Sequence, residues 1–455
     1  MISTKEQQLT VDKERLFRME ELFFSTTDSK GVITFANEVF TRISGYTEKE
    51  LIGQPHNIIR HPDMPRAVFF LLWDYIKKGE PMAAYVKNKA KDGSHYWVMA
   101  LVFPHREGYL SIRLKPGSDL FKEVKKIYKK TLTYERDQSS LHGSKKGMMA
   151  AVDYLQERLK EVGFESYDRF MWIALENEMR NRELELRKKN YTRKNSNGAV
   201  PPYLLSFENH LVKLFDHLKS LKDLHAKLIE HAGYILQLSR SIRMLSLNAQ
   251  VGSSRLDDGE GDSLSAVAGQ MGEQSMGGER MLAELQKHVT VLSRLLNKVN
   301  FDIITAKLQV EMSTIFMNEI HEKGSNAYLS DIPVPEVVDL LKEAYAPRLS
   351  LIADEVGQIP SSLRELRSRV YEIERFLYVL RFIHSAGKIE VARLEDATSF
   401  ANTFQELIRE VNTADGKLKE LSGYIEENQR MNPVFLESER VLSIARNGVH
   451  VNGSA

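Results

Sequence analysis

Pro55-His56-Asn57-Ile58-Ile59-Arg60-His61-Pro62-Asp63-Met64-Pro65 carries four charged or imidazole side chains among three prolines. Proline fixes φ and removes a backbone donor, and it also restricts the residue before it. The segment is therefore expected to be stiff and to hold Arg60, His61 and Asp63 in set directions. A stiff polar loop beside a small sheet predicts one wall of a ligand cavity.

The sequence on both sides of this loop predicts a small domain of mixed α and β structure. Residues 32–36 follow a turn and read as a strand, and Asn37 is a suitable N-cap for a short helix ending at Gly45. Asp92-Gly93 is a strong hairpin signal, because both turn positions tolerate positive φ. The further elements expected are an N-terminal cap helix at 10–22, a helix at 65–78, and antiparallel strands at 82–89, 94–104 and 108–114.

Several motifs in this region resemble the PAS domain of bacterial aerotaxis receptors. They are Asn37, Gly45-Tyr46-Thr47, Gly53-Gln54-Pro55-His56-Asn57, Arg60-His61-Pro62-Asp63-Met64-Pro65, Lys77-Lys78-Gly79-Glu80-Pro81, Val86-Lys87-Asn88 and His95-Tyr96-Trp97-Val98. The resemblance covers about the first quarter of the chain. It implies a sensor of cellular redox state or oxygen that binds FAD, with contacts at Arg60, His61 and Asp63 and with Asn37 and Asn88 lining the cavity.

Met82 stands where these receptors commonly have a tryptophan that packs on the flavin. Methionine fills such a space without offering a ring to stack. Three alternatives stay open: a bound flavin, an empty cavity or another ligand, and heme held by His61 or His95. Arg60 and Asp63 would, in a purely structural role, pair with each other and brace the loop.

Residues 121–200 read as a helical connector followed by a basic linker. Apolar residues there are spaced for helices, with a break at Gly163, and a basic, polar run from Arg187 to Gly198 leads to Pro201-Pro202. The functional interpretation is that the helices carry a signal onward from the PAS domain. A plain packing subdomain is the alternative.

A heptad pattern dominates the chain after Pro202. One column runs Leu204, Leu211, Leu218, His225 and Ala232, and its companion runs Phe207, Leu214, Leu221, Leu228, Ile235 and Ile242. Further columns precede and follow two short turns, near residues 252–261 and near residue 393. Sustained spacing of this kind predicts long antiparallel helical hairpins in a coiled coil or four-helix bundle.

Both turns resemble the hairpin tip of methyl-accepting chemotaxis proteins. The first keeps Leu247-Asn248-Ala249 and Arg255, with Gly252 at the family's glutamate position, and the second keeps Ile389-Glu390-Val391-Ala392-Arg393. In that family the tip binds a chemotaxis-type histidine kinase and its coupling protein. The resemblance therefore implies partner binding at Asn248, Arg255, Glu390 and Arg393.

These observations predict an α+β PAS domain followed by a mainly all-α region. The expected domains are 1–120 for the PAS domain with its cap helix, 121–200 for the connector, 201–325 and 326–430 for two tandem hairpins, and 431–455 for a flexible tail. Pro333 and Pro335 are expected to mark the crossover between hairpins. Pro347 and Pro360 are expected to delay regular helix until Ser361.

Composition narrows the function further. With 63 basic and 62 acidic residues the net charge is +1, which gives no reason to expect nucleic-acid or membrane-surface binding. The chain has no cysteine, which excludes disulfides and thiolate sites. It has neither a signal peptide nor an apolar run of spanning length, so a cytoplasmic protein is expected.

No motif for an enzyme is visible, so no enzyme activity is expected. The leading hypothesis is a transmembrane-free signal transducer of the aerotaxis or chemotaxis type, a redox sensor that relays its state through a helical bundle to a kinase-coupling complex. The alternative is a non-enzymatic scaffold with an empty PAS cavity and degenerate tips. PAS domains often pair, which leaves a homodimer open.

Overall fold

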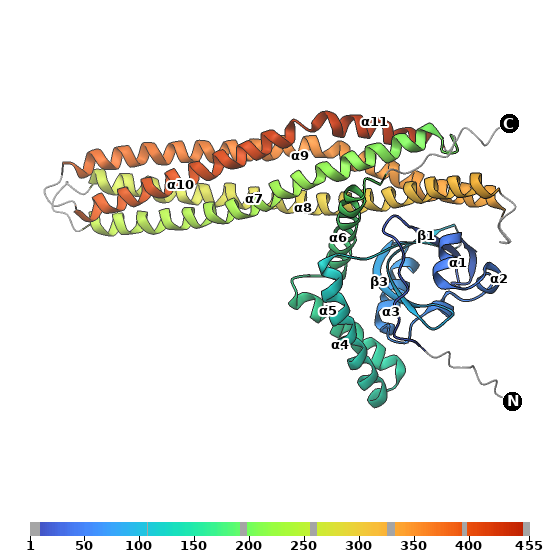
Figure 1. Cartoon of the computed structure of the whole chain (residues 1–455). Helices are drawn as coiled ribbons and strands as arrows, with labels where there is room; N and C mark the ends of the chain where they lie inside the picture. Colours follow the sequence, from blue (N-terminus) through green and yellow to red (C-terminus); the bar gives the residue numbers. More distant parts are fainter. Residues whose placement is uncertain are drawn as a thin grey trace. The chain divides into compact units, whose positions relative to one another are not determined.

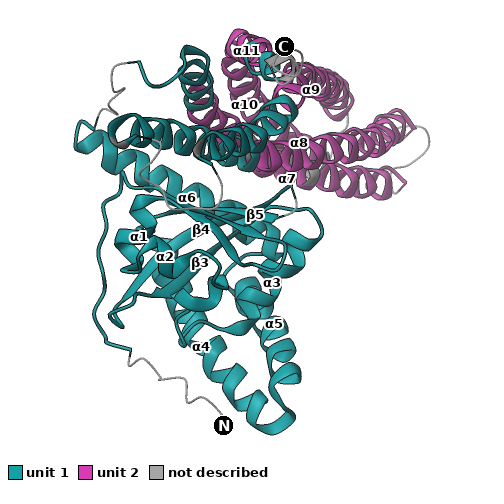
Figure 2. Cartoon of the chain, turned by 90° about the vertical axis from the view of Figure 1, so that its right-hand side faces the viewer, with its two compact units in different colours: residues 1–212, 300–352, 441–455 teal, residues 213–299, 353–440 magenta. Residues whose placement is uncertain are grey.

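The computed structural model describes residues 10–106, 108–191, 198–254, 262–324, 333–393 and 398–448. The chain divides into two compact units, coloured separately in Figure 2. Unit 1 comprises residues 1–212, 300–352 and 441–455, and unit 2 comprises residues 213–299 and 353–440. Each unit has its own buried core.

Unit 1 contains a five-stranded antiparallel sheet with the strand order β2-β1-β5-β4-β3. Its strands are β1 (Phe23–Asp28), β2 (Ile33–Ala36), β3 (Met82–Lys89), β4 (His95–His105) and β5 (Gly108–Leu114). β3 and β4 pair in register from Met82↔Val102 to Lys89↔His95. Gly93, at φ 85°, closes their turn as the Asp92-Gly93 signal predicted.

Short helices connect β2 to β3 across one face of this sheet (Figure 1). They are α1 (Glu38–Ser44), α2 (Glu48–Leu51), a 3₁₀ turn (His56–Ile59) and α3 (Arg66–Lys77). Asn37 caps α1 by accepting from the Phe40 amide, and Gly45 ends the helix at φ 74°, where a side chain would be strained. The sequence predicted both ends of this helix.

The predicted N-terminal cap helix at 10–22 is wrong, because the described residues of that segment contain no helix. The segment runs extended beside β4, with Arg15 N donating to His95 O and His95 N donating to Lys13 O. β5 ends at Leu114, opposite Met99, so the first residues of β4 lack a strand on that side. The N-terminal segment supplies those hydrogen bonds, which outweigh its helical periodicity.

Three helices follow the sheet: α4 (Asp119–His142), α5 (Ser144–Glu161) and α6 (Tyr167–Lys188). The predicted break at Gly163 is present, at φ 95°. The fully buried Glu178 of α6 accepts hydrogen bonds from Tyr85 of β3 (2.8 Å) and from Gly117 N (2.7 Å) and Ser118 N at the start of α4. One carboxylate therefore ties α6 to the sheet and to α4.

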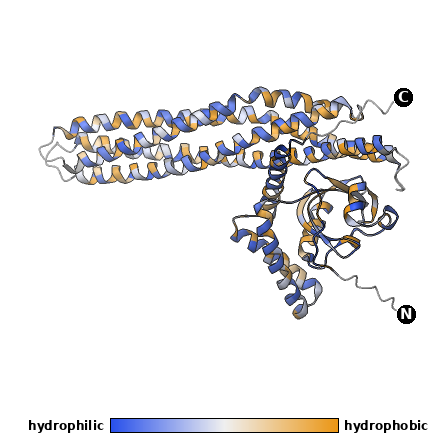
Figure 3. Cartoon of the chain, in the orientation of Figure 1, coloured by the Kyte–Doolittle hydropathy of each residue, from blue (hydrophilic) through white to orange (hydrophobic). Residues whose placement is uncertain are grey.

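The rest of the chain is α7 (Pro202–Ser253), α8 (Asp262–Lys323), α9 (Val334–Val391), α10 (Thr398–Gln429) and α11 (Asn432–Gly448). In unit 2 the first four form a four-helix bundle, and Figure 3 shows apolar and polar residues alternating along each. Interhelical ion pairs and hydrogen bonds join each helix to its two neighbours: Arg243–Glu279, Glu284–Arg369, Arg381–Asp415 and Tyr234–Glu410. The predicted fold class is confirmed.

Two predictions about the helical region are wrong. Helix α9 runs unbroken through Pro347 and Pro360, because burial of an apolar face along the whole helix offsets about 3 kcal/mol per proline. Residues 432–448 form α11 rather than a flexible tail, with Phe435 and Leu442 buried and Pro433 in the first turn, a position that favours helix. Residues 449–455 lie outside the described residues.

Within unit 1, α8 covers the face of the sheet opposite α1 and α3. Phe316 of α8 packs edge-on against Phe24 and Phe35, at 5.3 and 5.4 Å between ring centroids. This contact links the sheet to a long helix. Across the described residues, no helix combines the length and apolarity needed to cross a bilayer.

Candidate functional site

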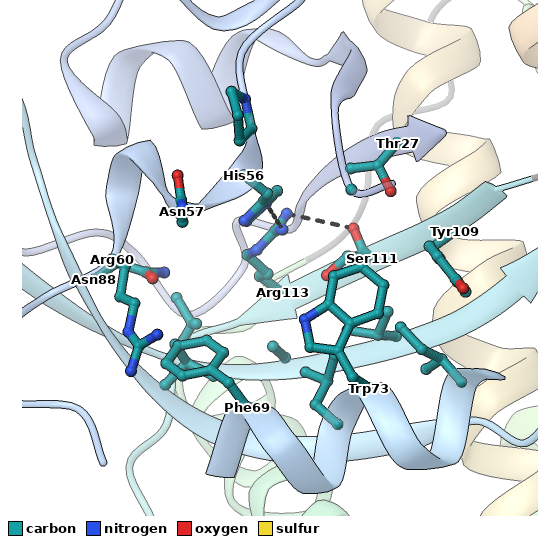
Figure 4. Close-up of a pocket in the computed structure, with 18 of the residues that line it drawn as sticks. Thr27, His56, Asn57, Arg60, Phe69, Trp73, Asn88, Tyr109, Ser111 and Arg113 are labelled. Atoms are coloured by element: carbon teal, nitrogen blue, oxygen red, sulfur yellow. Dashed lines mark hydrogen bonds between the residues drawn. The ribbon is translucent and has the colours of Figure 1, made fainter. Parts of the chain in front are cut away.

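A cavity of about 270 Å³ lies between the sheet, α3 and the proline loop (Figure 4). Its wall on α3 is apolar and aromatic, with Phe69, Leu72 and Trp73, and the β4 wall adds Val98 and Ala100. Trp73 meets Tyr109 of β5 edge-on at 5.4 Å. An apolar enclosure of this kind favours a flat ring system as ligand.

Arg113 of β5 brings a positive charge into this apolar cavity. It is 2% exposed, and it donates to Ser25 Oγ (3.1 Å), to Ser111 O (3.5 Å) and to His56 Nε2. Figure 4 shows the guanidinium between His56 and Ser111. Burial lowers the pKa of Arg113 to about 10, so the group stays charged at neutral pH. In the described part of the chain, no carboxylate pairs with it.

His56 is the acceptor for Arg113 rather than a second cation. Burial, together with the neighbouring positive charge of Arg113, lowers the pKa of His56 to about 3. The imidazole is therefore neutral at pH 7, and its Nε2 accepts the Arg113 hydrogen bond. Arg113 also lies over the Phe40 ring at 4.9 Å, which adds a cation–π contact.

Arg60 and Asn88 form another polar part of the cavity wall. They pair as an antiparallel bridge that joins the proline loop to β3. The Arg60 guanidinium lies 4.3 Å from the Phe69 ring centroid, and partial burial lowers its pKa. Ser111 Oγ, also in the cavity lining, is buried without a hydrogen-bond partner. A buried hydroxyl without a protein partner favours a ligand that supplies one.

Of the six residues predicted to hold a cofactor, Arg60 and Asn88 line the cavity, whereas the other four do not. Asn37 stabilises the backbone instead, because its Oδ1 accepts hydrogen bonds from Phe24 N (3.0 Å) and Phe40 N. Met82 is fully buried on β3, away from the cavity lining, and Trp73 supplies the indole there.

His61 and Asp63 brace the loop from outside the cavity. The Asp63 carboxylate lies 3.1 Å from Lys87 Nζ on β3 and 3.7 Å from Arg136 on α4. Partial burial works to raise the pKa of Asp63, but the Lys87 hydrogen bond and nearby cations keep it below its usual value. His61 Nδ1 accepts from Asp63 N at 3.1 Å, and burial lowers the pKa of His61 to about 4.

Three polar residues of the cavity lie on β5 and are not predicted from the sequence: Tyr109, Ser111 and Arg113. In the strand 108–114, Tyr109, Ser111 and Arg113 alternate with apolar residues. Such alternation usually means that the polar face meets water. Here both faces of the sheet are covered, so an arginine on the polar face becomes a buried cation. The combination of one charged residue with Ser and Tyr at alternate positions is the only signal that the sequence offers.

Residues 33–109 match a family model described as the PAS fold. The N-terminal region is a PAS domain. The chain is 45% identical over 136 residues to the aerotaxis receptor of Escherichia coli (strain K12), and 31% identical over 74 residues to a nitrogen fixation regulatory protein of Klebsiella pneumoniae. The aligned regions cover 29% and 16% of this chain, and 26% and 15% of those two proteins.

Solved structures also match the PAS domain. The light-state structure of the blue-light photoreceptor Aureochrome1 LOV aligns at 24% identity, covering 23% of this chain and 88% of that chain, with a TM-score of 0.21. This chain spans about a quarter or less of the length of these two curated relatives.

The predicted partner-binding residues lie in the helical region that follows the PAS domain. Asn248 is exposed on α7, and Glu390 pairs with Arg393 at 3.1 Å at the end of α9. Arg255 lies outside the described residues. The ends of α7 and α9 and the starts of α8 and α10 lie at one end of unit 2 (Figure 1). The described helix ends that flank both turns are thus at the same end of the bundle.

Proposed function

We propose that the PAS domain binds the ring system of a flavin nucleotide and that the helical region relays its redox state to a taxis-type kinase complex. The observation that carries this proposal is the buried cation Arg113 inside an aromatic cavity, with no carboxylate partner among the described residues. The 45% identity to an aerotaxis receptor over the N-terminal region supports the signalling class.

The cavity residues fit a flavin on chemical grounds. A flavin ring has flat apolar faces and one edge with carbonyl oxygens and ring nitrogens. The aromatic walls suit those faces, and Arg113, Asn88 and the unpartnered Ser111 hydroxyl suit that edge. A volume of about 270 Å³ suits the ring system alone. The phosphates and any further nucleotide would lie outside the cavity.

When bound, a flavin supplies a ring whose charge and hydrogen-bonding pattern depend on its oxidation state. Arg113 would hold the polar edge, and neutral His56 would keep the guanidinium oriented without adding charge. Arg60 and Asn88 would hold the ligand from the loop side and β3. A change in ligand charge would therefore first alter the contacts of β5 and of the proline loop.

Two sets of contacts support a relay from these elements to helices within unit 1. Arg113 donates to Ser25 of β1, and the preceding residue, Phe24, packs on Phe316 of α8. On the loop side, Asp63 faces Arg136 of α4. Glu135 of α4 also accepts from Ala67 N at the start of α3 (3.1 Å). Through both sets of contacts, a change at the cavity can favour one of two positions of a helix, as a two-state relay requires.

Absorbance of the purified full chain tests the cofactor. We expect the visible bands of an oxidised flavin, the release of FAD on acid extraction, and bleaching on reduction. Asn88→Ala is expected to reduce flavin content, and Asn248→Ala, an exposed asparagine of α7, is the matched control. A Soret band in the absorbance spectrum would indicate that the cavity holds heme instead of flavin. Protein that stays colourless after incubation with FAD would favour the scaffold alternative.

Capture of the chemotaxis-type kinase and its coupling protein tests the output separately. We expect binding that differs between oxidised and reduced protein and that weakens in Glu390→Ala. Equal absence of binding in both redox states would remove the chemotaxis part of the proposal and leave the cofactor part standing.

A further inference from the structure

Helix α9 carries a second apolar face besides the one in the bundle core. Its core face in unit 2 holds Leu363, Val370 and Leu377, which are buried. The outward face shows Tyr371, Tyr378, Phe382 and Ile389 at exposures of 60, 67, 72 and 57%. These outward residues are here called the α9 stripe. Surface helices usually have one apolar face, so a second one indicates a surface that another protein chain covers.

The spacing of the α9 stripe is that of a helix seam. Arg375 and Ser385 are exposed between its four apolar residues, so its six positions follow steps of three or four residues. Such steps place the residues along one line of a helix. The stripe is therefore shaped for another helix rather than for a small molecule.

The same spacing is symmetric about residue 380. Residues 371 and 389 lie nine positions to either side of 380, residues 375 and 385 five, and residues 378 and 382 two. A two-fold axis at that point, acting on an antiparallel helix pair, would place each stripe position opposite another stripe position. A two-fold interface requires this self-complementarity.

We propose that the α9 stripe pairs antiparallel with the α9 stripe of a second copy of this chain. Tyr371 then faces Ile389 of the other copy, Tyr378 faces Phe382, and Arg375 faces Ser385. The two central aromatic pairs fill the middle of the contact, where interface energy concentrates.

The exposed area suits a modest dimer. A buried aromatic side chain removes about 150–250 Å² from water, so the three exposed rings alone offer about 300–500 Å² per copy. With Ile389 and Val379 the pair would bury about 1,000 Å² in total, near the lower limit for a specific interface. The contact is therefore expected to form at moderate protein concentration and to dissociate on dilution.

Arg375 decides between antiparallel and parallel pairing. A parallel pair would set Arg375 directly against its own copy, at a cost in like-charge repulsion. In the antiparallel pair the two copies of Arg375 lie ten residues apart along the helices, about 15 Å, which is beyond one Debye length at physiological salt. Each aliphatic stem then lies along apolar surface.

Concentration-dependent mass measurement of the full chain tests the interface. Phe382→Glu is expected to weaken dimerisation about tenfold or more, with circular dichroism unchanged because the side chain is exposed. Met244→Glu, on α7 at 60% exposure, is the matched control and is expected to leave dimerisation unchanged. A chain that stays monomeric at every concentration, or two variants with equal effect, would overturn the proposal.

Engineered cysteines test the direction of pairing, because the natural chain has none. Antiparallel pairing predicts a disulfide when Arg375→Cys and Ser385→Cys proteins are mixed, and little in either alone. Cross-linking of each variant with itself would indicate a parallel pair, and absence of cross-linking in the mixture would exclude this contact. Neither result depends on a bound cofactor, so the inference and the proposed function fail separately.

Discussion

Helix α8 packs in two different ways along its length. In unit 2 its buried positions run from Leu264 to Val299 in alternating steps of four and three residues, which is the seam of a helical bundle. In unit 1 every side chain from Asn300 to Thr314 is buried. One chain segment is therefore held by a repetitive apolar seam, and the next by neighbours on all sides.

The segment in unit 1 buries polar groups, and each of its ionic groups has a specific partner. The pairs are Glu311–Arg182, Lys307–Glu183, Asn300–Glu176 and Asp302–Arg348. Apolar seams tolerate changes in register and residue type, whereas buried polar groups require one arrangement. In unit 1, α8 is therefore held by specific ion pairs and hydrogen bonds, whereas in unit 2 it is held by the packing of apolar side chains.

Removing one buried charge in unit 1 should have the largest effect. Arg182 is fully buried, donates to both oxygens of Glu311 (3.1 and 2.5 Å), and donates to Met19 O and Glu20 O. Arg182→Met removes the two hydrogen bonds that Arg182 donates to the buried Glu311 carboxylate and leaves Lys307 Nζ, at 3.6 Å, facing it. The free energy of unfolding of unit 1 should therefore fall by about 3–5 kcal/mol. Urea unfolding followed by the fluorescence of Trp73, Trp97 and Trp172 measures it.

The double variant Arg182→Met/Glu311→Leu is the control. It removes both charges and replaces them with apolar volume, which often costs little. Recovery of most of the lost free energy would show that the single variant suffers from the buried carboxylate that has lost its arginine. A double variant as unstable as the single one would mean that the hydrogen bonds to Met19 and Glu20 carry the effect.

The same contrast explains what could be predicted from the sequence. The seam of unit 2 repeats every seven residues, so local spacing is enough to indicate a bundle. The ends of α1 were also local, because Asn37 and Gly45 act within one turn. Arg182 and Glu311 are 129 residues apart, and nothing near either residue indicates its partner.

The candidate site shows the same limit. Arg60 and Asn88 were predicted and do line the cavity, whereas His61 and Asp63 come from the same motif and brace the loop instead. A motif identifies which residues occur together, but not which of them point inward. Arg113 becomes a cavity residue only because helices cover both faces of the sheet, and that depends on the whole of unit 1.

Acid should lower the free energy of unfolding of unit 1, by an amount between those of the other two predictions. The pKa values of His56 and His61 are about 3 and about 4 in the folded chain, below the usual value near 6.5. Below pH 6.5 these histidines bind protons in the unfolded chain but stay neutral in the folded chain. The free energy of unfolding therefore falls as pH falls. Each histidine contributes up to about 1.4 kcal/mol per pH unit.

Urea unfolding at pH 7.5, 6 and 5 measures this dependence. We expect unit 1 to lose up to about 4 kcal/mol over that range, and His56→Gln to flatten the pH profile by removing one titrating group. A flat profile in the unaltered chain would contradict the assignment of His56 as a neutral acceptor for Arg113.

A small effect is expected for the polar groups buried in the seam of unit 2. Ser239 of α7 and Ser275 of α8 are fully buried, and each hydroxyl donates to the other residue's carbonyl, at 2.8 and 2.6 Å. Ser275→Ala removes one of these hydrogen bonds without leaving a buried charge. The free energy of unfolding of unit 2 should therefore fall by about 1 kcal/mol, as measured by circular dichroism during urea unfolding.

Arg367→Ala is the matched reference, because its ion pair with Glu426 (3.0 Å) lies on the exposed surface of the same unit. Exposed pairs contribute about 0–1 kcal/mol, so this change should cost no more than Ser275→Ala. A loss at Ser275 as large as that at Arg182 would reverse the comparison, because unit 2 would then also depend on individual polar contacts. A small loss would leave the α7–α8 seam held mainly by the packing of its apolar side chains.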